Sequence, residues 1–243
     1  MDQKAVTEFF NSNYTLSHYE SAARKIGLWD SEEKIFSKIF KLEDSILELG
    51  CGAGRITIGM HELGYKNILG TDIANNMVTK ARHLSKVLGY SIPFRVCDAR
   101  KLEFEDSIFE GAIFGFNGLM QIPKYKFRFQ ALKEIHRILK KDGLFVFTSH
   151  LRSDERKAKF WKKESEIWSN NKQNPLLDDF GDKFYKCDHG EMFIHVPTKE
   201  SLESMIYQIG FKVEVIVKRS MISNESQEVR EFSDDCFFWI LRK

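Results

Sequence analysis

The chain has 243 residues, of which 42% are hydrophobic and 30% are charged, as is typical of a globular domain. Its net charge of +2 is too small to indicate a nucleic-acid or membrane surface by itself. The four cysteines form no CxxC pair, no apolar run could span a membrane, and Met1–Phe10 lacks the features of a signal peptide, so we expect a cytoplasmic protein.

Residues 1–40 carry apolar side chains near helical spacing, which predicts one or two helices with Ser31 as an N-cap. Short apolar segments and amphipathic segments then alternate along the chain. We expect strands over 45–50, 67–73, 93–99, 109–117 and 144–150, and helices over 54–64, 74–88 and 126–141. This alternation predicts an α/β protein with right-handed βαβ units and a parallel sheet.

Residues 151–196 interrupt the alternation with a polar stretch rich in Lys and Asn, and we expect an insertion over the sheet. A helix over 198–209 and strands over 211–217 and 236–242 follow, with a polar loop between the two strands. These strands have the pattern of an antiparallel hairpin added to the sheet edge.

Three glycines alternate directly after the first predicted strand, in the segment ILELGCGAGR. Glycine permits positive φ and lets a ligand approach the main chain, and such sheets bind ligands at the carboxyl ends of their strands. The spacing of Gly50, Gly52 and Gly54 is not the GxGxxG of dinucleotide-binding loops, because Arg55 occupies the expected position. The spacing therefore disfavours a pyrophosphate ligand. The alternative that this turn serves only packing is not excluded by the sequence.

Three carboxylates gather at the expected strand ends. Asp72 can accept both hydroxyls of a ribose, and Asp98 with the amide of Ala99 can read an adenine edge. Glu48 lies two residues before Gly50. Each acid alone could be a helix N-cap, but together they suit a ligand with an adenine, a ribose and a cationic tail.

The segments ILELGCGAGR, LGTDIANNMVTKAR, FRVCDARKLEFEDSIFEGAIFGFNGLMQI and ALKEIHRILKKDGLFVFTSH resemble the class I S-adenosylmethionine-dependent methyltransferases. The resemblance covers roughly residues 40–150. It implies a Rossmann-like seven-stranded sheet, mostly parallel with a C-terminal antiparallel hairpin, and helices on both faces. It also implies one domain over 1–243: a helical lid (1–40), a cofactor-binding core (41–150), a substrate-side insertion (151–196) and a C-terminal part (197–243).

The resemblance implies S-adenosyl-L-methionine as cofactor, with S-adenosyl-L-homocysteine as product. Glu48 and the glycine loop would hold the methionine part, Asp72 the ribose, and residues 114–117 the methyl-transfer site. The residues assigned to the cofactor are Tyr14, Tyr19, Glu48, Gly50, Cys51, Gly52, Gly54, Arg55, Asp72, Ile73, Met77, Asp98, Ala99, Arg100, Phe114, Phe116 and Asn117.

On the acceptor side we expect a small molecule and a monomer or homodimer, with His150 as a general base at the end of the fifth strand. Gln121, His189, Glu191 and His195 are further acceptor-side candidates, and we expect no metal because the histidines lack a third ligand.

The stretch 116–119 lacks the Asn/Asp-Pro-Pro-aromatic and Pro-Cys motifs of base methyltransferases, so we expect no DNA. Three alternatives stay open: an RNA or protein methyltransferase, a non-catalytic cofactor-binding protein, and a dinucleotide-dependent oxidoreductase.

Overall fold

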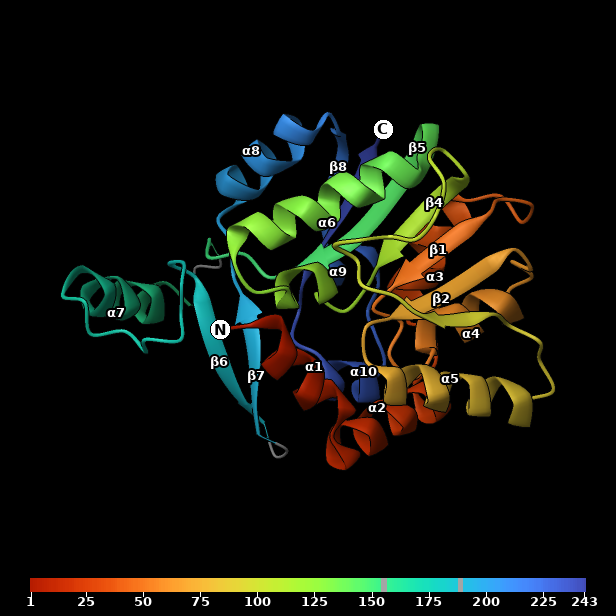
Figure 1. Cartoon of the computed structure of the whole chain (residues 1–243), viewed down its shortest axis with the longest axis horizontal. Helices are drawn as coiled ribbons and strands as arrows, with labels where there is room; N and C mark the ends of the chain where they lie inside the picture. The colour runs from red at the N-terminus through yellow and green to blue at the C-terminus, as the bar shows by residue number, and fades with distance from the viewer. Residues whose placement is uncertain (154–156, 188–189) are drawn as a thin grey trace.

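The computed structural model describes residues 1–153, 157–187 and 190–243. Its centre is a seven-stranded sheet in the order β3-β2-β1-β4-β5-β9-β8 (Figure 1). The strands are β1 (Ile46–Leu49), β2 (Ile68–Asp72), β3 (Phe94–Val96), β4 (Phe109–Phe114), β5 (Leu139–Ser149), β8 (Lys212–Lys218) and β9 (Phe237–Arg242). The first five strands pair in parallel, and β9 is antiparallel to β5 and β8. The predicted mostly parallel sheet with antiparallel C-terminal strands is confirmed.

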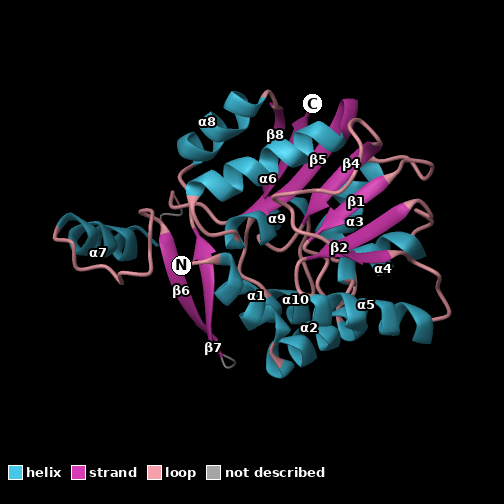
Figure 2. Ribbon diagram, in the orientation of Figure 1, coloured by secondary structure: helices cyan, strands magenta, loops and turns pink. Residues whose placement is uncertain are grey.

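Successive residues of the central strands enter two cores, one on each face of the sheet. Leu47, Ala112 and Phe145 belong to one core, and Ile46 and Ile113 belong to the other. The first core is covered by α6 (Tyr125–Ile138) and α8 (Lys199–Ile209), and the second by α3 (Asp30–Ile39) and α4 (Arg55–Glu62) (Figure 2). A further helix, α5 (Asn75–Val87), packs near β3. Burial on both faces explains why these strands read as continuous apolar runs.

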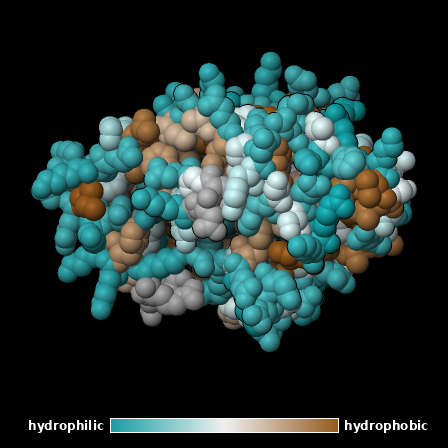
Figure 3. Space-filling model, turned by 90° about the horizontal axis from the view of Figure 1, so that it is seen from below, coloured by the Kyte–Doolittle hydropathy of each residue, from teal (hydrophilic) through white to brown (hydrophobic). Residues whose placement is uncertain are grey.

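The order of the strands reverses at β1, which pairs with β2 on one side and with β4 on the other. A parallel sheet opens a crevice at the carboxyl ends of the strands where its order reverses in this way. The N-terminal helices α1 (Gln3–Asn11) and α2 (Asn13–Lys25) lie beyond these ends, together with α10 (Gln227–Phe232) (Figure 1). From below, this side of the molecule is mostly hydrophilic, with hydrophobic residues in small separate groups (Figure 3).

Residues 1–40 form three helices instead of the one or two predicted, and Ser31 is not an N-cap. The third helix begins at Asp30 with Trp29 as its N-cap, two residues earlier than an N-cap at Ser31 would place it. The backbone N–H of Trp29 donates to the Glu32 carboxylate at 2.9 Å. This bond satisfies a donor at the start of the helix, so the Ser31 side chain is not needed as a cap.

Two other predicted boundaries were wrong. The predicted helix over 126–141 ends at Ile138, because Leu139 already pairs with Phe109 as the first residue of β5. The predicted polar loop after β8 contains α9 (Arg219–Ile222) and α10. The Ser226 hydroxyl accepts from the Val229 N–H at 3.3 Å and caps α10.

The insertion after β5 contains α7 (Ala158–Ser169) and a hairpin of β6 (Asp182–Cys187) and β7 (Gly190–His195). Helix α7 projects away from the sheet, at the left of Figure 1. The two ends of the insertion meet, because the Arg152 N–H donates to the Pro197 carbonyl at 2.9 Å. Within the described residues, we find no helix with the length and apolarity of a membrane span.

Candidate active site

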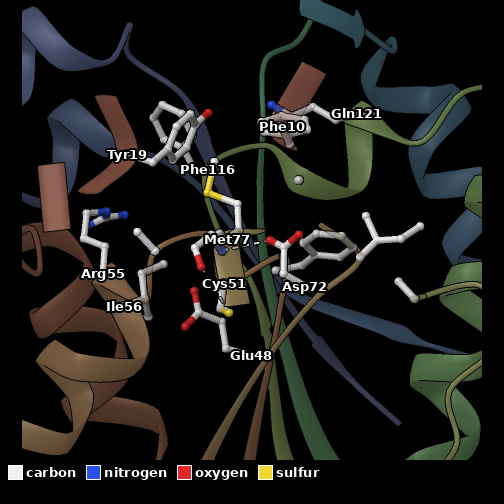
Figure 4. A pocket seen from close by; sticks show the side chains of 18 of the residues that line it. Phe10, Tyr19, Glu48, Cys51, Arg55, Ile56, Asp72, Met77, Phe116 and Gln121 are labelled. Carbon is white, nitrogen blue, oxygen red and sulfur yellow. Dashed lines mark hydrogen bonds between the residues drawn. The ribbon is translucent and has the colours of Figure 1, made fainter. Parts of the chain in front are cut away.

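A pocket opens at the carboxyl ends of β1, β2 and β4, beneath α1 and α2. Figure 4 shows Glu48 and Asp72 on its strand side and Phe10 and Tyr19 opposite them. The sequence-predicted cofactor residues that line this pocket are Tyr19, Glu48, Gly50, Cys51, Gly52, Arg55, Asp72, Ile73, Met77, Asp98, Ala99, Phe114 and Phe116. Residues from five separate segments of the chain thus meet around one space.

The glycine loop needs its glycines for both conformation and space. Gly50 and Gly52 have φ of +61° and +53°, in the left-handed region that favours glycine. A Cβ atom at Gly50 would lie 2.7 Å from the Phe114 ring. Gly54 (φ +91°) begins α4 and faces Phe94 and Ala81, so it serves packing and does not line the pocket.

The Asp72 carboxylate is held by two backbone donors. The Gly52 N–H and the Ala74 N–H each donate to one of its oxygens at 2.8 Å. Burial raises the pKa of Asp72, and these hydrogen bonds oppose the rise. Each oxygen keeps a further lone pair, so the carboxylate can accept from ligand hydroxyls as well.

Glu48 is buried at the base of the pocket and accepts a short hydrogen bond from the Thr57 hydroxyl. Burial raises the pKa of Glu48 to about 7, against the opposing effects of the Thr57 hydrogen bond and of Arg55. The group is therefore close to half-protonated at neutral pH. A cation bound in the pocket would favour its ionised form.

Asp98 and Arg100 pair with each other in the loop after β3. Arg100 Nη2 lies 2.6 Å from Asp98 Oδ2, and Nε lies 3.0 Å from both carboxylate oxygens. The guanidinium also lies over the Phe127 ring, 4.8 Å from its centroid. Arg100 does not line the pocket, so its role is to hold Asp98 in place beside Ala99.

Arg55 joins the loop to the N-terminal part of the chain. Its guanidinium makes two bonds of 2.6 Å to the Glu32 carboxylate and donates to the Gly27 carbonyl at 2.9 Å. It also lies 4.5 Å from the Trp29 ring centroid. The buried pair therefore fixes α3 against the start of α4.

The lid over the pocket differs in part from the prediction. Tyr19 lines the pocket, whereas the exposed Tyr14 does not. Phe10 on α1 and Phe232 on α10 also line the pocket and were not predicted from the sequence. The doublet Phe9–Phe10 in an amphipathic segment was a usable signal, but Phe232 lies in a stretch that showed no helical pattern.

The free volume of this first pocket is about 100 Å³, well below the ~300–1,000 Å³ typical of ligand pockets. Tyr19, Phe116 and Phe232 pack edge-on or stacked at its rim, with ring centroids 5.0–6.4 Å apart. The lid helices therefore close tightly over the strand ends.

A second cavity of about 540 Å³ adjoins the first pocket. Phe116, Gln121 and Phe232 line both, so the two spaces share a wall. About half of the other lining residues are apolar or aromatic and the rest are polar or charged, and they come mainly from the ends of β4 and β5, the insertion and the α10 segment. They include Asn117, His150, Leu151, Phe160, Trp161, Lys183, Tyr185, Met192, Ile194 and Phe237.

His150 and Asn117 lie together in this second cavity. Asn117 Nδ2 is 3.3 Å from His150 Nε2, and Asn117 was expected at the cofactor but does not line the first pocket. Burial lowers the pKa of His150, so its ring is neutral at pH 7 and can take up a proton. Phe116 and Asn117 have φ of +47° and +59°, a strained pair at the end of β4.

The remaining acceptor-side candidates take different places. Gln121 lines both spaces, and Glu191 is exposed on β7. His195 lines neither, because its Nδ1 lies 2.7 Å from a carboxylate oxygen of the buried Asp182. His189 lies outside the described residues.

Comparison with known proteins agrees with this arrangement. Residues 46–143 match the model of a family described as a methyltransferase domain. An uncharacterized protein of Methanocaldococcus jannaschii is 32% identical over 117 residues, which are 48% of this chain and 41% of that protein. A demethylmenaquinone methyltransferase of Staphylococcus epidermidis is 27% identical over 179 residues, which are 71% of this chain and 69% of that enzyme.

Among solved structures, a methyltransferase of Methanosarcina mazei described as SAM-dependent has a TM-score of 0.70. The match covers 86% of this chain and 96% of that one at 21% identity, so the two share a fold. The family match ends at residue 143, before the insertion that completes the second cavity.

Proposed function

Since the chain belongs to the class I S-adenosylmethionine-dependent methyltransferases, we propose that it methylates a small molecule held in the second cavity. The observation that carries the proposal is the shared wall of the two spaces. One space has carboxylates and a glycine loop, and the other is larger and combines apolar or aromatic side chains with polar ones. A donor and an acceptor bound on the two sides would meet at Phe116.

The residues of the first pocket fit the cofactor by their chemistry. Asp72 offers carboxylate lone pairs to ribose hydroxyls, and the Gly50–Gly54 backbone leaves room where side chains would clash. Glu48 adds negative charge for a cationic ligand when it is ionised, whereas the charge of Asp98 is offset by its pairing with Arg100. When bound, S-adenosylmethionine supplies a methyl group on a cationic sulfur, which keeps the electron pair of the broken C–S bond.

The chain contributes mainly alignment and exclusion of water. Alignment of two bound reactants alone supplies much of the rate of a displacement reaction. Tyr19, Phe116 and Phe232 cover the junction with aromatic rings, and Gln121 offers an amide to either side.

His150 is the proposed general base for an acceptor that carries a proton. Its Nε2 lies beside Asn117 in the second cavity, and the backbone of Asp235 hydrogen-bonds to the ring. The acceptor proton would pass to this imidazole as the nucleophile forms its new bond to carbon.

The acceptor class is proposed to be a small molecule because the second cavity is bounded by the insertion and by α10. The relative from Staphylococcus epidermidis is named for a small-molecule acceptor, demethylmenaquinone. This likeness supports the class of acceptor and not the compound.

Calorimetric titration with S-adenosylmethionine, S-adenosylhomocysteine and NAD tests the proposal. We expect the first two to bind and NAD not to bind. Asp72→Asn should weaken binding at least about ten-fold, since it replaces a carboxylate acceptor by an amide. Asp44→Asn is the matched control, because Asp44 caps an exposed turn before the amino end of β1, opposite the end at which the pocket lies. Binding of NAD alone would contradict the proposal.

The role of His150 is tested by the pH profile of methyl transfer once an acceptor is in hand. Because burial lowers its pKa below the ordinary 6.5, the rate should rise with pH only in the acid range and stay level above it. His150→Gln should lower kcat by about 100-fold and leave the affinity for S-adenosylhomocysteine unchanged. Unchanged turnover in this variant would remove His150 as the base.

A further inference from the structure

We propose that the second cavity binds an aromatic carboxylic acid with a hydroxyl group, and that Lys183 pairs with its carboxylate. The proposal specifies the class of acceptor for the proposed function. It rests on that function only for the statement that this ligand is the methyl acceptor. It follows from the polar groups of the cavity that have no hydrogen-bond or ion-pair partner among the described residues.

Lys183 is a half-buried cation on β6 that lines the cavity. Its Nζ lies 3.4 Å from the centroid of the Phe160 ring and 5.8 Å from that of Trp161. In the ranges that the structure describes, no carboxylate lies within 4.0 Å of it. Burial and the charge of Lys157 lower the pKa of Lys183, and Glu164 on α7 opposes this from a greater distance.

The acids around the cavity are already partnered. Lys157 Nζ lies 3.2 Å from Asp234, and Lys218 Nζ lies 3.6 Å from Asp235. Glu231 accepts from the Gln227 amide at 2.7 Å. Among the described residues that line the cavity, Lys183 is therefore the cation without a carboxylate partner, and it is left for an anionic ligand.

Trp161 adds a second donor on the same side of the cavity. Its indole Nε1 is buried and has no hydrogen-bond acceptor among the described residues. A buried donor without a partner is unfavourable, and a ligand oxygen that accepts from it would remove this cost. An ammonium and an indole N–H together suit a carboxylate, which offers two acceptor oxygens.

The side of the second cavity that adjoins the first pocket offers a hydrogen-bond acceptor instead of donors. Asn117 Oδ1 is buried and, within the described part of the chain, lacks a donor. With the neutral His150 beside it, it can accept from a hydroxyl of the ligand. The carboxylate would thus face the insertion and the hydroxyl would face the donor pocket, while Phe160, Met192 and Ile194 offer apolar surface to a ring between them.

The test uses 3-hydroxy-2-naphthoate and its neutral carboxamide, titrated into the 243-residue protein with saturating S-adenosylhomocysteine. The acid should bind at least about ten-fold more tightly than the amide. Lys183→Gln should abolish this preference and leave the affinity for the amide unchanged, whereas Lys183→Arg should keep the preference. Lys186→Gln is the matched control, since Lys186 is exposed on the same strand and does not line the cavity.

Equal binding of acid and amide, a preference that survives Lys183→Gln, or no binding of either compound would each overturn the assignment. Repeating the titration without S-adenosylhomocysteine separates the two proposals. A protein that binds neither S-adenosylmethionine nor its product but still prefers the acid through Lys183 contradicts the proposed function and not the acceptor site.

Discussion

Glu48 is the residue whose charge the ligand is expected to change. Its pKa of about 7, against an ordinary 4.5, means that the folded protein holds a proton which the unfolded chain has already lost at pH 5–7. The stabilising contribution of this proton is present below pH 4.5 and is lost as the pH rises through 7.

A cationic cofactor near Glu48 should lower this pKa and expel the proton. At pH 7 we expect S-adenosylmethionine binding to release about 0.5 proton, measured by calorimetry in buffers of different ionisation enthalpy. Glu48→Gln should reduce the release to near zero, while the Asp44→Asn control should keep it. An equal release from Glu48→Gln would show that another group titrates.

Single residues could be predicted where their role depends on the local chain. The glycine loop, Glu48 and Asp72 lie at strand ends, and the sequence order alone brings such ends to one edge. His195 could not be predicted, because its partner Asp182 lies on a paired strand and both pack near the buried Arg128. Phe232 carried no signal because its short helix depends on packing.

At the scale of the elements, the packing of α3 against the start of α4 depends on the buried ion pair between Glu32 and Arg55. Removing one partner of such a pair leaves an uncompensated charge, which costs about 3–5 kcal/mol. We expect Glu32→Gln to lower the free energy of unfolding by about 3 kcal/mol in urea denaturation.

The matched control for this pair is Lys4–Glu8 on α1, at 3.8 Å with most of both side chains exposed. Glu8→Gln should change the unfolding free energy by less than about 0.5 kcal/mol. If Glu32→Gln also changes the unfolding free energy by less than about 0.5 kcal/mol, Arg55 finds another partner when residue 32 is neutral.

The types and the order of the longer helices and strands could be predicted from the periodicity of their hydrophobic residues. The residues at which these elements end could not be predicted in this way. Helix α6 gives way to β5 at Leu139, although the residues up to Lys141 fit a helix. Pairing with β4 decides that boundary, and no local pattern reports it. The helices α9 and α10 are too short to show a period.

For the whole molecule, the closed lid predicts that ligand entry depends on motion of α1 and α2. The end of α1 is held to α5 by Asn76, whose backbone N–H and side-chain amide donate to Asn11 at 3.0 and 3.1 Å. Asn76→Ala removes the side-chain bond, worth about 0.5–1.5 kcal/mol. We expect association and dissociation of S-adenosylhomocysteine to speed up together, by about 2–10-fold, in stopped-flow fluorescence.

Asn67→Ala is the control for this prediction, because Asn67 donates to the Glu43 carbonyl at an exposed loop away from the lid. Its binding rates should match those of the unmodified protein. If Asn76→Ala leaves both rates unchanged, opening of the lid does not limit entry.

The hydrogen bond between Arg152 and Pro197 closes the insertion at its base. The chain leaves β5 and returns toward α8 at this point, while other contacts also hold the insertion to the fold, such as the pair of Asp179 with the buried Arg128 on α6. A segment of different length or content that supplied such contacts could join the same two ends with the order of the seven strands unchanged. Related proteins that exchanged this segment would change the residues around the second cavity and keep the residues of the first pocket.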